Sequence, residues 1–292
     1  MNEPAGSDLP VEGGTLRVLR FGRGPRIALA AHGITGSGMS FRAMARHLPD
    51  EWSLFAPDLR GRGGSADTPG PYGLDRHAMD LCRLAQDVGG GRPVALTGHS
   101  MGAYTALRAA ALRPALFDRL LLVDGGLPLP VPPGTDLDAV LDTTLGPALA
   151  RLGRTYETDA AYVDFFRAHP ALGPHWNADI ETYVRYDVTG PRGARRSKVR
   201  EEAVRHDGRD LLTSADLFAA GLTGLGVPVL LLHASLGLLG QEPPMLEASV
   251  VARWTGGPVN LPAELVEGSN HYTILLGTAA RTVAERFVAL GG

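Results

Sequence analysis

The stretch VALTGHSMGAYTALRAAALR, residues 94–113, is the part of the chain that decides the fold. Its first residues, Val94–Thr97, are apolar or β-branched, and a short run of this kind is typical of a buried parallel strand. Residues Met101–Arg113 are rich in alanine and leucine and predict a helix. Pro114 ends this helix, because proline supplies no N–H and disfavours helical backbone in the residue before it. The sequence therefore predicts a strand that turns directly into a helix.

A serine occupies the sharp turn between these two elements. Ser100 is flanked by Gly98 and Gly102 in the pattern G-x-S-x-G. Such a turn needs small neighbours, because its backbone is strained and the strand and the helix approach each other closely. The free N–H groups and the positive dipole end of the helix lie beside the serine oxygen. We therefore interpret Ser100 as a nucleophile; the alternative is a serine that only caps a helix.

Composition excludes several other classes of protein. The chain has 292 residues, 44% of them hydrophobic, which is enough for one α/β domain with an insertion. The net charge is −3 and the basic residues are dispersed, so we expect neither a nucleic acid nor a membrane as a partner. Cys82 is the single cysteine, and the spacing of His, Asp and Glu residues does not suit a metal site. We expect no metal and no cofactor.

The N-terminal stretch and the single cysteine indicate the cellular compartment to expect. Met1–Gly14 is polar and acidic, without the basic start and apolar core of a signal peptide. A single free thiol fits a reducing compartment. We therefore expect a cytoplasmic protein, a monomer or a small homo-oligomer, that acts on a small molecule.

Short strand-like runs alternate with helical stretches along the chain. Alternation of this kind predicts an α/β fold with a mostly parallel, doubly wound sheet covered by helices on both faces. Ligands of such sheets bind beyond the carboxyl ends of the strands. The runs are Leu16–Phe21, Ile27–Ala31, Ser53–Ala56, Val94–Thr97, Leu120–Val123, Val229–Leu232 and Ala263–Val266.

Three motifs come directly after three of these runs. His32–Ser37 is HGITGS, Pro57–Ser65 is PDLRGRGGS, and Gly98–Gly102 is GHSMG. In these motifs and their order the chain resembles the α/β-hydrolase superfamily, whose members carry H-G-x-x-G, D-x-R-G-x-G-x-S and G-x-S-x-G after successive strands. The resemblance covers nearly the whole chain and implies the α/β-hydrolase fold.

The resemblance also implies roles for residues around Ser100. It implies an oxyanion hole made by the N–H groups of Ile34 and Met101, two donors that stabilise the negative charge of a tetrahedral intermediate. A plainer and compatible interpretation is that Gly33 only permits a turn. His271 follows the last strand-like run, where the family places its general base. The alternative for His271 is a histidine that caps a helix.

The acid of the triad departs from the common pattern of the family. Members usually carry it directly after the seventh strand, yet Val229–Gln241 contains no carboxylate. The first carboxylate beyond this run is Glu242, several residues after the expected strand end. Asp124 ends the run Leu120–Val123, 24 residues after Ser100. Some branches place the acid there, including zearalenone-type lactone hydrolases and, with an aspartate nucleophile, certain haloalkane dehalogenases. We predict Asp124 as the acid, with Glu242 as the alternative acid and a simple turn as the alternative role of Asp124.

Two further charged residues belong to the second motif. Asp58 and Arg60 are separated by one residue in the loop after a strand-like run. We expect them to form an ion pair that stabilises this loop and to take no part in the chemistry.

A long insertion follows the sixth strand. About a hundred residues, 126–226, lie where a strand-to-strand crossover needs only a few dozen. The resemblance implies that they form a helical cap over an α/β-hydrolase core made of residues 1–125 and 227–292. The insertion opens with a proline-rich hinge, Pro128–Pro133, and carries the aromatic residues Tyr156, Tyr162, Phe165, Phe166, Trp176, Tyr183, Tyr186 and Phe218.

Some residues beside the nucleophile and in the cap are expected to face the substrate. We predict substrate contacts for Gly33, His99, Trp176 and Tyr183, although most cap aromatics should serve the packing of the cap itself. Aromatic walls would suit a substrate with an apolar acyl or ring portion.

These residues predict a cofactor-independent serine hydrolase that cleaves an ester, lactone or thioester of a small to medium apolar molecule through an acyl-enzyme on Ser100. A second interpretation keeps the triad for a perhydrolase or a C–C bond hydrolase. A third is a small-molecule receptor with the same fold, which would show one turnover or very few.

Overall fold

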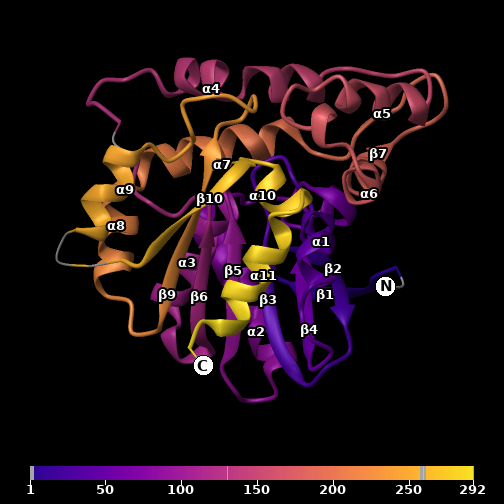
Figure 1. Ribbon diagram of the computed structural model, residues 1–292. Coiled ribbons are helices and arrows are strands. Elements are labelled where there is room, and N and C mark those ends of the chain that lie inside the picture. The colour runs from indigo at the N-terminus through magenta and orange to yellow at the C-terminus, as the bar shows by residue number, and fades with distance from the viewer. Residues whose placement is uncertain (1–2, 130, 257–258, 260, 292) are drawn as a thin grey trace.

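The computed structural model describes residues 3–129, 131–256, 259 and 261–291, and these form a sheet covered by helices (Figure 1). Eight strands of the described chain make this sheet, in the order β1-β2-β4-β3-β5-β6-β9-β10. β1 and β2, and also β2 and β4, pair antiparallel, whereas the other neighbours pair parallel. The strands are β1 (Ala5–Val11), β2 (Gly14–Gly22), β3 (Arg26–Ala31), β4 (Trp52–Pro57), β5 (Val94–His99), β6 (Phe117–Val123), β9 (Val229–Leu236) and β10 (Ala263–Asn270).

The predicted fold class is confirmed. Each of the seven strand-like runs lies inside a strand of this sheet. β1 was not predicted, and the reason is its position: it lies at the edge of the sheet and buries Leu9 alone among its residues. A strand with one buried side chain leaves no alternating hydrophobic pattern in the sequence.

Two hydrophobic clusters hold helices on the two faces of the sheet. Along β6, Leu120 and Leu122 belong to one cluster, and Leu121 and Val123 to the other, because successive side chains of a strand point to opposite faces. The first cluster includes α2 (Leu74–Gly89), α3 (Met101–Leu112), α8 (Ala215–Thr223) and α9 (Ala248–Thr255). The second includes α1 (Arg42–Ala45), α10 (Thr273–Leu276) and α11 (Ala280–Ala289).

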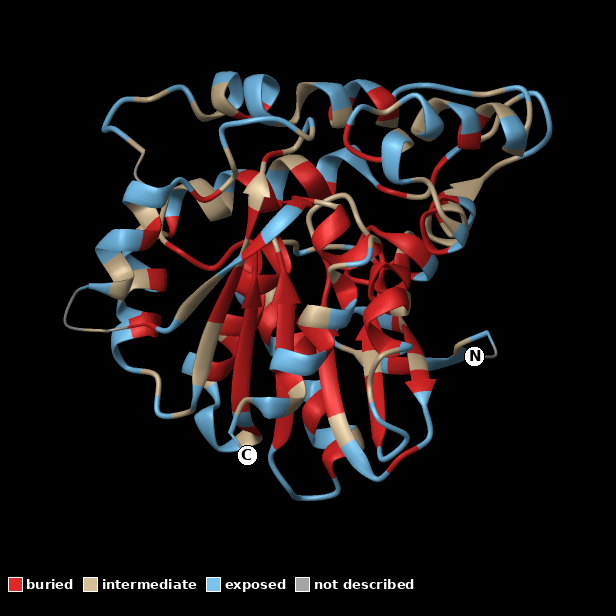
Figure 2. Cartoon of the chain, in the orientation of Figure 1, coloured by how far each residue is buried: buried red, intermediate tan, exposed pale blue. Residues whose placement is uncertain are grey.

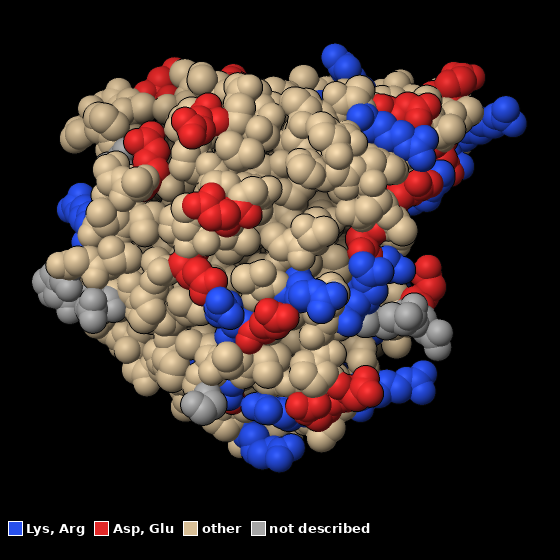
Figure 3. Space-filling model, viewed as in Figure 1, with Lys and Arg blue, Asp and Glu red and all other residues tan. Residues whose placement is uncertain are grey.

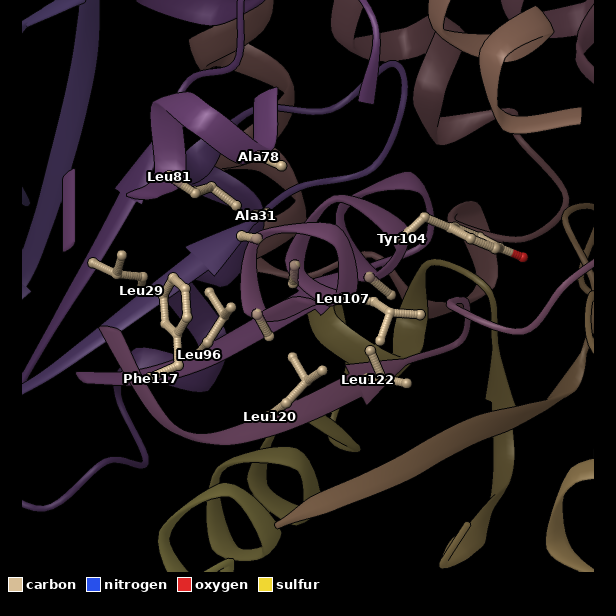
Figure 4. Packing of buried hydrophobic residues seen from close by; sticks show 14 of the residues in the cluster. Leu29, Ala31, Ala78, Leu81, Leu96, Tyr104, Leu107, Phe117, Leu120 and Leu122 are labelled. Carbon is tan, nitrogen blue, oxygen red and sulfur yellow. The ribbon is translucent and has the colours of Figure 1, made fainter. Parts of the chain in front are cut away.

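The central strands β3, β4, β5 and β6 are buried along most of their length (Figure 2), which is why they read as nearly continuous apolar runs. Figure 4 shows Leu96, Leu120 and Leu122 facing Leu107, which α3 supplies. Dense packing under α3 fixes the helix that begins directly after Ser100.

The segment between β6 and β9 forms most of the layer above the sheet in Figure 1. A third hydrophobic cluster, centred on Tyr162, Ile180 and Val184, packs α5 and α6 together and includes Leu276 of α10. α8 packs instead against α3, with the rings of Phe218 and Tyr104 4.7 Å apart. The division into a core and a cap at residues 126–226 stays a prediction. The elements of this segment are α4 (Leu137–Leu152), α5 (Asp159–Arg167), α6 (Ala178–Asp187), β7 (Val188–Thr189), β8 (Arg196–Ser197), α7 (Glu201–Thr213) and α8.

Three helices of this segment begin at a side chain that caps them. Asp136 accepts hydrogen bonds from the first N–H groups of α4, Thr158 does so for α5, and Asn177 for α6. Each such cap contributes about 1 kcal/mol to helix stability. The start of each helix is therefore set locally, whereas its position over the sheet depends on packing.

Figure 3 shows charges of both signs on this face, with acidic side chains prevailing at the upper left. Basic and acidic side chains alternate along its lower and right margins, and the upper centre is largely uncharged. Among the described residues, no helix has the length and apolar character that crossing a membrane requires.

Candidate active site

The turn that carries Ser100 is the most constrained point of the backbone. Ser100 has a φ of 55°, in the region that L-residues rarely adopt. A Cβ on Gly98 would lie 2.1 Å from the carbonyl oxygen of Gly102, and a Cβ on Gly102 would lie 2.0 Å from that of Ala31. Both positions therefore require glycine, and the strained turn presents the serine at the end of β5.

Ser100, His271 and Asp124 come together beyond the carboxyl ends of three strands. Nε2 of His271 lies 3.0 Å from Oγ of Ser100, and Nδ1 of His271 lies 2.6 Å from Oδ2 of Asp124. Asp124 is buried, and its Oδ1 accepts a hydrogen bond of 3.0 Å from the N–H of Ala234. With Nδ1–H directed at the carboxylate, Nε2 presents its lone pair to the serine hydroxyl.

The two candidate acids differ in their geometry. Asp124 follows β6 directly and has a φ of 46°, so its side chain turns toward the histidine. Glu242 is exposed, and among the described residues no hydrogen bond or ion pair joins it to His271. The arrangement therefore fits Asp124 and does not fit Glu242.

The loop that carries His271 is held from several sides. The side-chain oxygen of Asn270 accepts hydrogen bonds from the N–H groups of Tyr272 and Thr273, and its amide donates to the carbonyl of Ala171 at 2.9 Å. Nε2 of His99 donates to the carbonyl of His271 at 2.8 Å. These contacts fix the imidazole over Ser100 and tie its loop to the segment above.

His99 is held in its neutral form. Burial and the neighbouring His271 lower the pKa of His99 to about 3. Because Nε2 donates to the carbonyl of His271, Nδ1 is left as an acceptor near Gly33 and Ser100.

The N–H groups of Ile34 and Met101 are available as a pair of donors. Among the described residues, no hydrogen bond engages either of them. The carbonyl of Gly33 accepts a hydrogen bond of 2.8 Å from Nδ1 of His32, whose Nε2 in turn accepts from the N–H of Leu59 at 2.9 Å. Because the carbonyl and N–H of a trans peptide point in opposite directions, this contact orients the N–H of Ile34. Burial lowers the pKa of His32 to about 3 and keeps this donor neutral.

The expected ion pair between Asp58 and Arg60 is absent from the described structure. Asp58 accepts hydrogen bonds from the N–H groups of Gly38 and Gly64 and from the hydroxyl of Tyr186. Arg60 instead pairs with Asp80 on α2, with Nε 2.6 Å from Oδ2. Neighbouring backbone donors satisfy Asp58 locally, which leaves Arg60 free to turn to the opposite side of its loop. The prediction of this ion pair was wrong.

A cavity of about 200 Å³ opens above Ser100. Of the residues predicted to contact the substrate, Gly33, His99 and Tyr183 line it. The cavity is lined by Gly33, Ile34, Thr35, Gly36, Ser40, His99, Ser100, Thr143, Thr144, Leu145, Pro147, Ala148, Arg151, Phe165, Phe166, His169, Leu172, Tyr183, Leu238, Leu239, Met245, His271, Tyr272, Leu275 and Leu276.

Trp176 does not line this cavity. Its ring lies under the guanidinium of Arg167, 5.2 Å from the ring centre, and its indole N–H donates to Glu181. Trp176 lies in the short connection before α6, and the sequence did not specify the direction in which its ring would point. The prediction of substrate contact for Trp176 is not supported by this position.

A second, smaller cavity of about 90 Å³ meets Ser100 from another side. Its wall is mostly aliphatic, and it shares Ile34, Ser100, Thr144, Leu145 and Met245 with the larger cavity. A group attached to a carbonyl at Ser100 thus has two compartments to enter. The remaining residues of the smaller one are Met101, Tyr104, Asp124, Leu129, Val140, Leu141, Gly208, Leu211, Leu212 and Leu246.

Three polar residues of the larger cavity were not predicted from the sequence. Arg151, His169 and Tyr272 line it. No motif surrounds the first two, which lie between β6 and β9, and Tyr272 directly follows His271. Among the described residues, no group of three His, Cys, Asp or Glu side chains is arranged to hold a metal ion.

Comparisons with known proteins place the chain in a family. The family model described as alpha/beta hydrolase fold matches residues 29–235, most of the chain, so the protein belongs to the α/β-hydrolase family. Lipase LipV of Mycobacterium tuberculosis is 37% identical over 131 residues, which are 44% of this chain and 48% of that protein. The chain spans about half, or less, of the length of the curated relatives that it matches.

Solved structures extend the likeness of fold over nearly the whole chain. The crystal structure of E-2-(acetamidomethylene)succinate hydrolase has a TM-score of 0.78 at 24% identity, covering 98% of this chain and 100% of that one. The thioesterase domain from the curacin biosynthetic pathway has a TM-score of 0.75 at 20% identity, covering 99% and 100%. At such identities these likenesses show the fold alone. The likeness to zearalenone-type lactone hydrolases stays a prediction.

Proposed function

We propose that the protein is a serine hydrolase that cleaves an ester, lactone or thioester through an acyl-enzyme on Ser100. One observation carries this proposal: Ser100, His271 and Asp124 form a continuous hydrogen-bonded series at the floor of a cavity. The N–H groups of Ile34 and Met101, which no hydrogen bond engages among the described residues, are the proposed donors to an oxyanion. These are the elements that acyl transfer requires.

The proposed reaction has two halves. The Oγ of Ser100 attacks the carbonyl carbon as its proton passes to Nε2 of His271, and Asp124 stabilises the imidazolium that forms. The N–H groups of Ile34 and Met101 stabilise the oxyanion, at about 3 kcal/mol for each donor. The bond to the leaving group then breaks, and that group takes the proton from His271. Water, deprotonated by His271 in the same way, hydrolyses the acyl-enzyme and restores Ser100.

The similar proteins support the proposal of a hydrolase, but their names state different substrate classes. One is named as a lipase, and similar folds include a thioesterase domain and a succinate-derivative hydrolase. An apolar acyl or ring portion of the substrate would suit the aliphatic and aromatic residues of the cavity wall. A cytoplasmic location and a monomeric or small homo-oligomeric state stay predictions.

The experiment is a turnover assay combined with intact-mass measurement. We expect many turnovers on at least one series among p-nitrophenyl esters of increasing chain length, acyl thioesters and lactones. An organophosphonate probe should add one adduct to the wild type and none to Ser100→Ala. A protein that binds these compounds and stops after one turnover would be a receptor, and the proposal would be wrong.

A further inference from the structure

One residue of the larger cavity carries a permanent charge. Among the described lining residues, Arg151 is the one arginine or lysine, and no aspartate or glutamate accompanies it. Its side chain is 5% exposed. Burying a guanidinium is costly unless it is paired, and the buried carboxylate of Asp187 supplies a pair for this one.

Arg151, on α4, is anchored by one nitrogen only. Its Nη1 donates to the hydroxyl of Tyr162 at 2.7 Å and to Oδ2 of Asp187 at 3.0 Å. That same carboxylate oxygen also accepts from the hydroxyl of Ser197 at 2.8 Å. In the described part of the chain, no hydrogen bond engages Nε or Nη2 of Arg151. The edge of the guanidinium formed by Nε and Nη2 is one of the two that can bind a planar anion with two parallel hydrogen bonds.

Other donors of the cavity lie within the field of Arg151. The pKa of His169 is lowered by burial and by the charge of Arg151. Burial raises the pKa values of Tyr183 and Tyr272, and the charge of Arg151 opposes this rise at both hydroxyls. Nδ1 of His169 accepts from the N–H of Ala171 at 3.2 Å, so the proton of this neutral ring is on Nε2. The polar end of the cavity is therefore rich in donors.

We propose that the free edge of Arg151 binds a carboxylate of the substrate, so that the protein acts on esters or thioesters whose acyl or leaving group bears a carboxylate. This inference rests on the proposed function and names the substrate class of the same site. The carboxylate pairs with Arg151 while the scissile carbonyl lies at Ser100. The part on the other side of the carbonyl enters the smaller, aliphatic cavity.

The interaction should be selective because Arg151 is the one lysine or arginine among the described lining residues, and no lining carboxylate competes with a bound anion for it. A neutral group at this position would leave Nε and Nη2 without partners, which is the costlier arrangement in a buried site. Asp187 does not compete for that edge, since it contacts Nη1. The geometry thus holds the arginine in place and leaves its binding edge open.

The test compares matched pairs of substrates that differ in one charge. The first pair is the mono-p-nitrophenyl ester of glutarate and its methyl-capped diester, which place the carboxylate in the acyl group. The second pair is 4-butyryloxybenzoate and its methyl ester, which place it in the leaving group. In at least one pair we expect kcat/KM to be higher for the carboxylate by on the order of 10- to 100-fold. Equal kcat/KM values within both pairs would overturn the inference while leaving the proposed function intact.

Variants of Arg151 show whether this preference comes from its guanidinium. Arg151→Gln should bring the ratio of the two kcat/KM values to near one, and Arg151→Lys should give an intermediate ratio because it keeps the charge but not the planar edge. A purely structural role would lower both rates and preserve the ratio. Arg151→Gln combined with Asp187→Asn avoids an unpaired buried carboxylate, and circular dichroism checks its fold. Arg167→Gln, on an exposed arginine of α5, is the matched control and should keep the wild-type ratio.

A binding experiment separates this inference from the proposed function. Monomethyl glutarate and dimethyl glutarate are titrated calorimetrically into Ser100→Ala and into the same variant with Arg151→Gln. We expect the monoanion to bind Ser100→Ala more tightly than the neutral diester, and the difference to vanish without Arg151. Because this measurement does not require turnover, it tests the carboxylate site even if the protein hydrolyses no ester. Equal binding of both compounds to Ser100→Ala would overturn the carboxylate site.

Discussion

The strand ends of the core and the helices above them contribute to the candidate site in different ways. Ser100 and Asp124 lie directly after strands, at backbone positions with positive φ where few conformations are possible. Arg151 and Tyr183 lie on α4 and α6, and the packing of these helices decides which way the side chains point. The comparison teaches that the proposed reacting groups are positioned by local turns, whereas the residues proposed to recognise the substrate are positioned by how the helices pack over the sheet.

The largest expected effect tests whether the reaction depends on the serine at the end of β5. Ser100→Ala removes the proposed nucleophile and should lower kcat by on the order of 10⁴- to 10⁶-fold, because only binding and oxyanion stabilisation remain. Steady-state kinetics on the best ester of the panel measure this change. A variant with a tenth of the wild-type rate would show that the reaction does not need this side chain.

The next effect tests the acid at the end of β6. Asp124→Asn should lower kcat by roughly 10⁴-fold, because the amide loses the charge that stabilises the imidazolium and selects its tautomer. Glu242→Gln is the matched control on an exposed loop and should change kcat/KM by less than about tenfold. If Glu242→Gln were inactive and Asp124→Asn active, the proposed triad would be wrong in its third member.

The buried histidines of the core predict how stability depends on pH. His32 and His99 have their pKa lowered by burial from 6.5 to about 3, so the unfolded chain binds their protons more readily than the folded one. Their contribution to stability is complete above pH 6.5 and is lost as the pH falls toward about 3. At about pH 4.5 each histidine should lower the free energy of unfolding by about 3 kcal/mol.

Denaturant unfolding at a series of pH values measures this loss. His99→Gln should reduce the slope of unfolding free energy against pH by up to about 1.4 kcal/mol per pH unit between these limits. His175→Gln, on an exposed histidine, should leave the slope as it is. An unchanged slope in His99→Gln would contradict the neutral, buried state of that ring.

The smallest expected effect compares two aromatic residues of the segment between β6 and β9. Tyr183 lines the larger cavity and Trp176 does not. Tyr183→Ala should therefore raise KM by about tenfold for substrates that fill the cavity, as expected for the loss of roughly 1.4 kcal/mol of contact. Trp176→Ala should change KM by less than about threefold. A larger effect at Trp176 than at Tyr183 would mean that the substrate contacts another face of the cap.

Sequence reasoning succeeded where a residue's environment follows from its immediate neighbours. The strand before Ser100 and the helix after it are confirmed, and Gly98 and Gly102 lie where a Cβ would meet backbone oxygen. It failed where a side chain had a choice of partners. Arg60 pairs with Asp80 rather than with Asp58, and Trp176 faces Arg167 rather than the cavity.

The sequence by itself determined the α/β class, the order of the motifs and the turn at which Ser100 lies, because strand periodicity and the steric limits of a tight turn act over a few residues. Only the tertiary structure decided that His271 meets Asp124 rather than Glu242 and that Arg151 faces the cavity. These contacts join residues far apart in the chain. Their geometry depends on the register of β6 against β9 and on the packing of the helices above the sheet, which no local pattern specifies.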